Sequence, residues 1–214
     1  MSTPDNNELK ERERCAWASV ADGWKRRDDL LRKGAAPVTE RMLELAGISP
    51  GHRVLDIASG TGEPATSAAE LTGMTGKVIG TDLTEEMLAY ARDKAASAGL
   101  ANIEFLCVDG ETLDFEADTF DAVTIRWGLM FMPEPEACLR LANRVMKKDS
   151  RIAIACWSAP DKNPFVGVLI QTLGKYMEVP KPPPGAPGIF AMADPERLHG
   201  VIAAAGFRNI ELEE

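Results

Sequence analysis

Short apolar runs rich in valine and isoleucine alternate along the chain with stretches of helical spacing. Five such runs predict strands, at residues 53–58, 77–82, 103–108, 120–126 and 151–157. Three stretches between them predict helices, at residues 64–71, 85–98 and 134–146. Alternation of strands and helices is typical of a doubly wound, mostly parallel sheet with helices on both faces, so the pattern predicts an α/β fold.

The helix predicted at residues 85–98 has clear limits at both ends. Thr84 can cap its first turn, and Glu85 and Glu86 favour the positive end of the helix dipole. Gly99 follows the last apolar turn and is the residue type that most often ends a helix. These limits support the alternation of strands and helices in this part of the chain.

The two flanks of the alternating region are less regular. Residues 8–45 predict two or three helices broken near Gly23 and Gly34, which would lie outside the sheet. Beyond the fifth strand we predict, in order, a helix, a proline-rich surface loop, a further helix and a strand, at residues 163–176, 181–188, 194–205 and 208–213. With 214 residues in all, the chain fits a single domain.

The composition is that of a globular protein, with 45% hydrophobic and 27% charged residues and a net charge of −9. The basic cluster Lys25-Arg26-Arg27 is followed by Asp28 and Asp29, so no nucleic-acid partner is expected. No stretch of the sequence has signal-peptide or membrane-span character, and we predict a cytoplasmic protein without an integral membrane segment. The four cysteines are widely spaced, which predicts neither a metal site nor a redox pair.

A glycine-containing turn between the first strand and the first helix carries the strongest chemical signal. Gly60 and Gly62 allow the backbone to approach a ligand closely. The spacing Gly60-x-Gly62-x-x-Ala65 also fits the loose fingerprint of dinucleotide-binding proteins, with Asp82 about 20 residues further on for a ribose. A nicotinamide-dependent oxidoreductase is therefore one interpretation of this segment.

Two carboxylates at the same turn argue against an anionic dinucleotide. Asp56 ends the strand and Glu63 begins the helix, so a pyrophosphate would meet two negative charges. A ligand with a cationic amino acid end and an adenosine end suits the turn better, because a carboxylate attracts an ammonium while Asp82 can hold ribose hydroxyls. S-adenosylmethionine (SAM) is such a ligand, and we predict it as the cofactor.

Four stretches at the ends of predicted strands resemble motifs of the class I SAM-dependent methyltransferases. They are similar in particular to the small-molecule branch that includes the ubiquinone/menaquinone C-methyltransferases (methyltransferase type 11). The four stretches are Asp56-Ile57-Ala58-Ser59-Gly60-Thr61-Gly62, Val78–Met87, Cys107–Gly110 and Phe120–Gly128. The resemblance extends over residues 35–157 and implies a Rossmann-like fold. Ala58 stands where the family more often has glycine.

The resemblance implies a cofactor bound at the carboxyl ends of the strands, as is general for open parallel sheets. The residues implied are Asp56, Ala58, Ser59, Gly60, Thr61, Gly62, Asp82, Leu83, Met87, Asp109, Gly110, Arg126 and Trp127. Within this set, Asp82 would bind the ribose hydroxyls and Asp109 the adenine amine, while Arg126 and Trp127 would face the methionine part of the cofactor.

The single domain then divides into four parts. Residues 1–46 would form an N-terminal helical lid and residues 47–157 the cofactor-binding core. Residues 158–193 would form an acceptor-side insertion with the proline-rich loop, and residues 194–214 the last helix and strand.

The segments that flank the cofactor would form the acceptor pocket, with Trp17, Trp24, Met130, Phe131 and Trp157 as candidate lining residues. Methionine and aromatic side chains suit an apolar or aromatic acceptor, although the same residues could equally close the core over the sheet. We predict methyl transfer from SAM to a small, largely apolar or aromatic metabolite, with oxygen or carbon favoured as the attacked atom.

No catalytic residue is identified from the sequence. His52 precedes the first strand, at the end of the sheet opposite the cofactor, and His199 lies in the last predicted helix. We therefore expect catalysis mainly by positioning and desolvation. From another functional class, the chain could be a SAM-binding regulatory or scaffold subunit without catalysis, because the motifs describe cofactor binding only.

The family fold has seven strands, the last of which is inserted antiparallel between the fifth and the sixth. Residues 208–213 look like the sixth strand, and no candidate for the seventh follows. We expect a truncated chain or an incomplete sheet, with association of copies through the open edge. Residues 144–150 depart from the family's usual Arg-Val-Leu-Lys-Pro-Gly-Gly, and we expect an altered turn there with no loss of activity.

Overall fold

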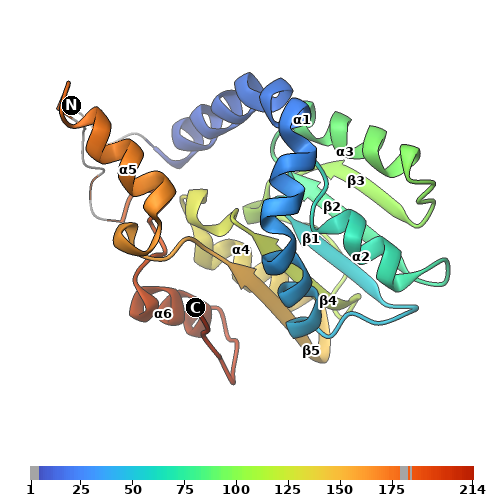
Figure 1. Cartoon of the computed structure of the whole chain (residues 1–214). Coiled ribbons are helices and arrows are strands. Elements are labelled where there is room, and N and C mark those ends of the chain that lie inside the picture. The colour runs from blue at the N-terminus through green and yellow to red at the C-terminus, as the bar shows by residue number, and fades with distance from the viewer. Residues whose placement is uncertain (1–4, 179–182, 184) are drawn as a thin grey trace.

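Five parallel strands form one sheet in the order β3-β2-β1-β4-β5 (Figure 1). The computed structural model describes residues 5–178, 183 and 185–214. Its strands are β1 (Arg53–Ile57), β2 (Lys77–Asp82), β3 (Ile103–Cys107), β4 (Phe120–Arg126) and β5 (Met146–Ala155). The predicted α/β fold with a mostly parallel sheet is confirmed, and each of the five predicted strands is present.

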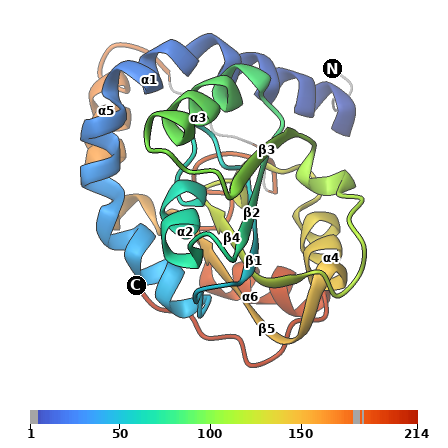
Figure 2. The same ribbon diagram turned by 90° about the vertical axis from the view of Figure 1, so that its right-hand side faces the viewer.

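Helices cover both faces of this sheet (Figure 2). They are α1 (Asn6–Leu45), α2 (Ala65–Thr72), α3 (Glu85–Ser97), α4 (Pro135–Val145), α5 (Pro164–Leu173) and α6 (Pro195–Ala204). Three short 3-10 helices are η1 (Gly110–Thr112), η2 (Leu129–Phe131) and η3 (Pro160–Lys162). The second half of α1 lies with α2 and α3 on one face, and α4 and α6 lie on the other.

Two further sequence predictions concern the membrane and the proline-rich loop. None of the described helices is both long enough and apolar enough to span a membrane. Of the surface loop predicted at residues 181–188, positions 181, 182 and 184 lie outside the described residues.

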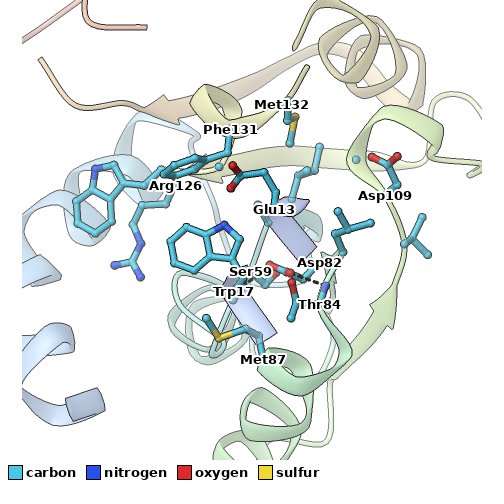
Figure 3. Close-up of a pocket in the computed structure, with 18 of the residues that line it drawn as sticks. Glu13, Trp17, Ser59, Asp82, Thr84, Met87, Asp109, Arg126, Phe131 and Met132 are labelled. Atoms are coloured by element: carbon cyan, nitrogen blue, oxygen red, sulfur yellow. Dashed lines mark hydrogen bonds between the residues drawn. The ribbon is translucent and has the colours of Figure 1, made fainter. Parts of the chain in front are cut away.

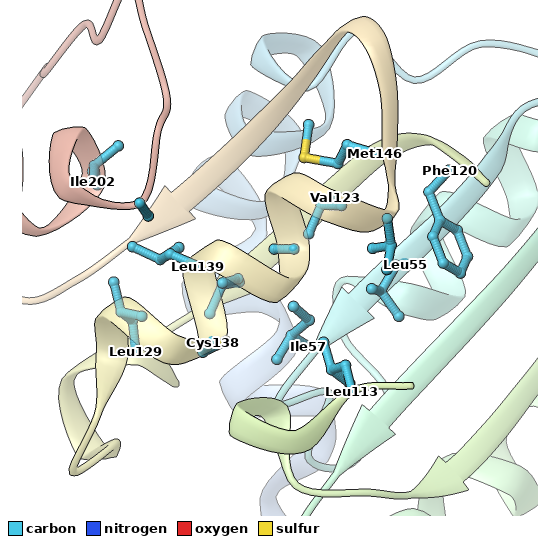
Figure 4. Packing of buried hydrophobic residues seen from close by; sticks show 14 of the residues in the cluster. Leu55, Ile57, Leu113, Phe120, Val123, Leu129, Cys138, Leu139, Met146 and Ile202 are labelled. Atoms are coloured by element: carbon cyan, nitrogen blue, oxygen red, sulfur yellow. The ribbon is translucent and has the colours of Figure 1, made fainter. Parts of the chain in front are cut away.

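An apolar cluster lies on each face of the sheet. Leu55 of β1 packs with Leu139 of α4 and Ile202 of α6 (Figure 4). Val54, the preceding residue of β1, faces the opposite cluster, where it packs with Met42 of α1. Because β1 is covered on both faces, its successive residues Val54 and Leu55 are both apolar and buried instead of alternating with polar residues.

The strand order places a crevice at one end of the sheet. β1 lies between β2 and β4, and the chain proceeds outward from β1 to β3 before it returns to β4 on the other side. The connections therefore leave the ends of β1 and β4 in opposite directions. In open parallel sheets ligands bind at such a point, outside the carboxyl ends of the strands.

The N-terminal region forms one helix of 40 residues, α1, instead of the two or three helices predicted. The side chain of Asp5 caps it by accepting a hydrogen bond from the N–H of Glu8 at 2.9 Å. The helix continues through Gly23, Gly34 and Pro37. The prediction of breaks at the two glycines is therefore wrong.

Tertiary contacts along α1 outweigh the unfavourable helix propensity of glycine, which is about 1 kcal/mol relative to alanine. Asp28 forms an ion pair with Lys94 of α3 at 2.6 Å, and the ammonium of Lys25 lies 4.3 Å from the ring centroid of Tyr90. Further along the helix, Met42 is buried against the sheet. These contacts hold both halves of α1 in place, so the glycines between them remain helical.

The start of β5 is irregular and lies earlier in the chain than predicted. Phe120 of β4 pairs with Met146, but the next pair joins Ala122 to Arg151. The segment between Met146 and Arg151 therefore bulges out of the ladder. The bulge stands where the family's usual turn would be, in agreement with the expected altered turn.

The C-terminal segment forms no strand, and the prediction of a strand at residues 208–213 is wrong. A strand needs a neighbour for its backbone hydrogen bonds, and the described residues include no seventh strand that could pair with it. Its side chains contact other segments instead: Glu213 pairs with Arg41 at 2.8 Å, and Glu214 pairs with Lys162. Within the described part of the chain, the outer edge of β5 has no strand partner.

Replacing both glycines of α1 with alanine tests whether α1 is one helix in solution. A Cβ at Gly23 or Gly34 meets no atom within 4 Å, so the change should act only through backbone entropy and helix propensity. We expect the free energy of unfolding of the double variant G23A/G34A, measured by urea denaturation, to rise by about 1 to 2 kcal/mol. No increase would mean that the helix is broken there.

The matched control is Gly62→Ala, which should lower the free energy of unfolding. Gly62 has a φ of +107°, and its Cβ would lie 3.2 Å from the Cβ of Ala91 in α3. The same chemical change is therefore expected to have opposite signs at the two kinds of position.

Candidate active site

A cavity opens above the carboxyl ends of β1, β2 and β4, beneath the first half of α1 (Figure 3). Of the residues that the sequence assigns to the cofactor, those that line it are Ala58, Ser59, Gly60, Thr61, Asp82, Leu83, Met87, Asp109, Gly110, Arg126 and Trp127. Of those assigned to the acceptor, Trp17, Trp24 and Phe131 line it. The cavity lining does not include Asp56, Gly62, Met130 or Trp157.

The turn after β1 forms the floor of this cavity. Ala58 and Gly60 have positive φ angles of 60° and 53°, and the Ser59 N–H donates to the carbonyl of Thr81 in β2 at 2.9 Å. A Cβ at Gly128, which follows β4, would lie 2.3 Å from the Cβ of Ala58. Only glycine permits this close approach, so the two strand ends present backbone to the same space.

Asp82, the last residue of β2, connects two loops at the cavity. Its Oδ2 accepts from the Gly60 N–H at 2.9 Å and its Oδ1 accepts from the Thr84 N–H at 2.8 Å. Thr84 is the N-cap of α3, as predicted, but its side chain makes no capping hydrogen bond. Burial raises the pKa of Asp82, and the backbone N–H groups oppose this rise. Each carboxylate oxygen has a second lone pair with which it can accept from a ligand hydroxyl.

Asp56 is fully buried in β1 and lies beneath the cavity rather than in its lining. Its Oδ1 accepts from the Thr124 hydroxyl at 2.6 Å, and its Oδ2 has no hydrogen-bond partner among the described residues. Burial raises the pKa of Asp56 to about 6, against hydrogen bonds from Ser59 and Thr124 and the charge of Arg126. Because the carboxylate lies below the lining, Asp56 is positioned to support the turn above it.

Arg126 ends β4 at the cavity wall, and Trp127 follows it. Arg126 donates to the hydroxyl of Thr39 in α1 at 2.8 Å and to the carbonyl of Glu63 at 3.0 Å, so it ties α1 to the turn after β1. The ring of Trp127 stacks on that of Trp157, with centroids 5.0 Å apart and planes 2° from parallel. The ring of Trp157 therefore backs Trp127, and the cavity lining includes Trp127 only.

Gly62 and Met130 also serve packing rather than lining. A Cβ at Gly62 would crowd Ala91, so this glycine allows α3 to approach the turn after β1. Met130 lies in η2 with only 1% of its surface exposed, because its side chain points into the protein. Its neighbour Phe131 faces the cavity instead.

One face of α1 covers the cavity, and two residues on that face were not predicted from the sequence. Lys10, Glu13, Trp17 and Trp24 follow one another at intervals of three, four and seven residues, which places them on one side of a helix. The centroid of the Trp17 ring lies 5.3 Å from that of Phe131 and 5.9 Å from that of Trp24. Their helical spacing from the two tryptophans was the signal that could have identified Lys10 and Glu13.

Lys10 reaches from α1 to the loop after β3. Its Nζ lies 2.7 Å from Oδ2 of Asp109 and also pairs with Glu111. Burial opposes the charge of Lys10, but hydrogen bonds to Asp109 and Glu111 raise its pKa overall. A ligand amine at Asp109 would therefore compete with Lys10 for the same carboxylate.

The cavity lining is acidic. Its charged groups are the carboxylates Glu13, Glu63, Asp82, Asp109 and Glu111 and the bases Lys10 and Arg126. The carboxylate of Glu63 accepts hydrogen bonds from Thr66 and Ser67 at the start of α2, at 2.7 and 2.8 Å. A surplus of carboxylates favours a cationic ligand over a phosphate. In the described part of the chain, no group of three or more side chains is arranged to hold a metal ion.

The parallel sheet, the glycine turn after β1 and the carboxylate that ends β2 together define a class I SAM-dependent methyltransferase. More specifically, the chain belongs to the ubiE/COQ5 methyltransferase family, whose model matches residues 18–176. The predicted family is confirmed, and the predicted enzyme class and cofactor are those of this family.

Two relatives are named as ubiquinone/menaquinone biosynthesis C-methyltransferases. The protein from Ectopseudomonas mendocina is 37% identical over 156 residues, which is 72% of this chain and 60% of that protein. The protein from Cellvibrio japonicus is 32% identical over 210 residues, which is 90% of this chain and 82% of that protein. The chain thus matches 60% of the length of the first relative and most of the second.

Solved structures share the fold. A SAM-dependent methyltransferase from Aquifex aeolicus is similar with a TM-score of 0.61 and 25% identity, covering 79% of each chain. The [4+2]-cyclase SpnF is similar with a TM-score of 0.62 and 25% identity, covering 81% of this chain and 57% of that one. Since the second of these is named a cyclase, the fold alone does not determine the reaction.

The raised pKa of Asp56 predicts a pH-dependent stability difference from the variant Asp56→Asn. The folded protein binds this proton more tightly than the unfolded chain, whose carboxyl titrates near 3.8. The free energy of unfolding contributed by Asp56 is therefore lost as the pH rises from about 4 through about 6. The variant lacks this titrating group, so its free energy of unfolding relative to that of wild type should rise by on the order of 3 kcal/mol between pH 4 and pH 7, measured by urea denaturation at both pH values.

The control for this experiment is Asp114→Asn, which replaces an exposed carboxylate outside the cavity. Its stability difference from wild type should be nearly the same at both pH values. An equally constant difference for Asp56→Asn would show that Asp56 ionises as an exposed carboxyl does.

Proposed function

We propose that this chain transfers a methyl group from SAM to a small aromatic or largely apolar acceptor. The observation that carries the proposal is the acidic cavity at the strand ends, which the aromatic face of α1 covers on one side. The names of the relatives favour carbon as the methylated atom and a quinol-type ring as the acceptor, with oxygen as the alternative.

The residues present fit SAM in charge and in position. Carboxylates outnumber basic groups in the lining, which suits a ligand that carries a sulfonium and an ammonium. We assign the ribose hydroxyls to Asp82, the adenine amine to Asp109, the adenine ring to the N–H of Gly110, and the methionine part to the turn from Ala58 to Thr61. When bound, SAM supplies an electrophilic methyl group on a cationic sulfur.

The chain itself contributes mainly position and a dry environment. Trp17, Trp24 and Phe131 form an aromatic wall that would hold a flat acceptor and exclude water from it. Arg126 keeps α1 attached to the turn after β1, so the wall and the cofactor floor are held in one geometry. Holding two reactants in line can supply a large part of the rate enhancement of a displacement.

The alternative functions are less well supported. A nicotinamide dinucleotide would place its pyrophosphate over an acidic turn, and both terminal nitrogens of Arg126, the one guanidinium in the described cavity lining, already donate to Thr39 and to the carbonyl of Glu63. A SAM-binding subunit without catalysis would have the same cofactor site. The methylation assay described below distinguishes the two, because only an enzyme releases S-adenosylhomocysteine in the presence of an acceptor.

Several sequence predictions stay predictions. They are the cytoplasmic location, the lack of a nucleic-acid partner, and the association of copies through the sheet edge. The unpaired edge of β5 within the described residues supports the last of these.

Removing the carboxylate of Asp82 should weaken SAM binding. Because hydrogen bonds to charged groups contribute about 1.5 to 3 kcal/mol, we expect the Kd of Asp82→Asn to rise by roughly 10- to 100-fold in titration calorimetry. The control variant Asp114→Asn, which changes an exposed carboxylate outside the cavity, should bind SAM as wild type does. NADH should bind neither to wild type nor to the variants. Binding of NADH in preference to SAM would overturn the proposal.

Truncating the aromatic wall should weaken acceptor binding. Trp17→Ala removes a ring that packs on Phe131, and we expect the KM for an aromatic acceptor to rise roughly 10-fold or more with little change in SAM affinity. The assay is release of S-adenosylhomocysteine with a panel of quinols, phenols and small acids. Trp157→Ala is the matched control, since Trp157 lies behind Trp127. An equal rise in KM for both variants would show that the acceptor pocket extends to Trp157. If wild type methylates no compound of the panel, the SAM-binding subunit without catalysis is favoured instead.

A further inference from the structure

We propose that Glu13 of α1 accepts the proton from a hydroxyl group of the methyl acceptor, an inference that rests on the proposed methylation of an aromatic acceptor. Glu13 lines the cavity, and Figure 3 shows its carboxylate beside the rings of Phe131 and Trp17. These two rings belong to the aromatic wall, with centroids 5.3 Å apart. A phenolic ring held against this wall would bring its hydroxyl within reach of the carboxylate.

Apart from a hydrogen bond with Trp17, the surroundings of Glu13 leave its carboxylate available. Lys10 lies one turn away on the same face of α1, but its ammonium is paired with Asp109 and Glu111. Arg126 faces the cavity from β4, and its two terminal nitrogens donate to α1 and to the turn after β1, whereas its Nε has no hydrogen-bond partner among the described residues. Within the described part of the chain, Glu13 has no ion-pair partner.

The remaining charged groups near Glu13 do not compete for the same proton. Asp82 faces the cavity from β2, but both of its oxygens accept backbone N–H groups. Burial raises the pKa of Glu13, whereas a hydrogen bond with Trp17 and the charge of Arg12 oppose this rise. A raised pKa makes a carboxylate a stronger proton acceptor. The two histidines, His52 and His199, lie outside the cavity lining.

The proposed step balances in atoms and electrons. The O–H bond of the acceptor breaks and its proton passes to an oxygen of Glu13. The acceptor oxygen, or the ring carbon conjugated with it, forms a bond to the methyl carbon as the carbon–sulfur bond breaks, and the electron pair of that bond remains on sulfur as a neutral thioether. For transfer to carbon, the ring carbon then loses its hydrogen as a proton and the oxygen regains one. In both cases one proton is released to solvent.

The first test measures proton uptake without methyl transfer. The protein is saturated with S-adenosylhomocysteine and titrated at pH 9 with 4-nitrophenol, which is ionised at that pH. Two acidic groups that share one site hold one proton between them, so binding of the phenolate to wild type should take up about one proton per site. Calorimetry in buffers of different ionisation enthalpy gives this number. Glu13→Gln should bind the phenolate without proton uptake.

The second test measures the rate with a phenolic acceptor found in the methylation assay. General bases contribute 10²- to 10⁴-fold, so kcat of Glu13→Gln, measured at saturating SAM, should fall roughly 100-fold or more. The rate of the variant should recover as the pH rises toward the pKa of the phenol, and acceptors that are already ionised should lose least. Glu40→Gln, an exposed position on the same helix, is the control and should match wild type.

The outcomes separate this inference from the proposed function. Equal proton uptake by wild type and Glu13→Gln, or no binding of 4-nitrophenol to wild type, overturns the role of Glu13. The same holds if kcat is unchanged in Glu13→Gln while wild type methylates phenols. If wild type takes up the proton and the variant does not, the assignment of Glu13 stands even where no acceptor is methylated, and only the proposed function fails.

Discussion

The two hydrogen bonds of the Asp82 carboxylate are the contacts on which the shape of the site depends. One oxygen holds the N–H of Gly60 in the turn after β1, and the other holds the N–H of Thr84 at the start of α3. Without the carboxylate, both donors would be left unpaired in a largely buried place, at a cost of about 1 to 3 kcal/mol each. The residue assigned to the ribose therefore also fixes the floor on which the cofactor would rest.

The second constraint is the attachment of α1 above this floor. Polar contacts hold the helix along its length, among them Lys10 to the loop after β3, Asp28 to α3 and Thr39 to Arg126 of β4. Because the first of these occupies the carboxylate of Asp109, the proposed binding of adenine there would be coupled to the seating of the start of α1. The start of α1 also carries Glu13 and Trp17, so the same coupling extends from the cofactor side of the cavity to the acceptor side.

Local sequence patterns predicted the parts of the structure that local physics determines. The strands that end in Asp82 and near Asp109 follow from apolar runs that stop at a carboxylate, and parallel pairing then brings those ends together. The patterns failed where distant contacts decide. Gly23 remains helical because α3 supports α1, and residues 208–214 join no strand, although the outer edge of β5 is unpaired within the described residues. Burial of Asp56 below the lining is likewise a property of the packed sheet, which the motif alone does not show.

The carboxylates around the cavity differ in what already binds them, and this difference sorts structural acids from those available to a ligand. Asp56 accepts from Thr124 beneath the floor, Glu63 accepts from hydroxyls of α2, and Asp82 accepts from two backbone N–H groups. Each of these acids supports a turn or a helix start. Glu13 supports no turn or helix start, since it projects from the first half of a regular helix whose backbone bonds are complete without it, and its hydrogen bond is with Trp17 of the cavity lining. A half-buried carboxylate that supports no turn or helix start lowers the stability of the fold by its desolvation, and the proposed contact with an acceptor hydroxyl would explain its place beside the aromatic wall.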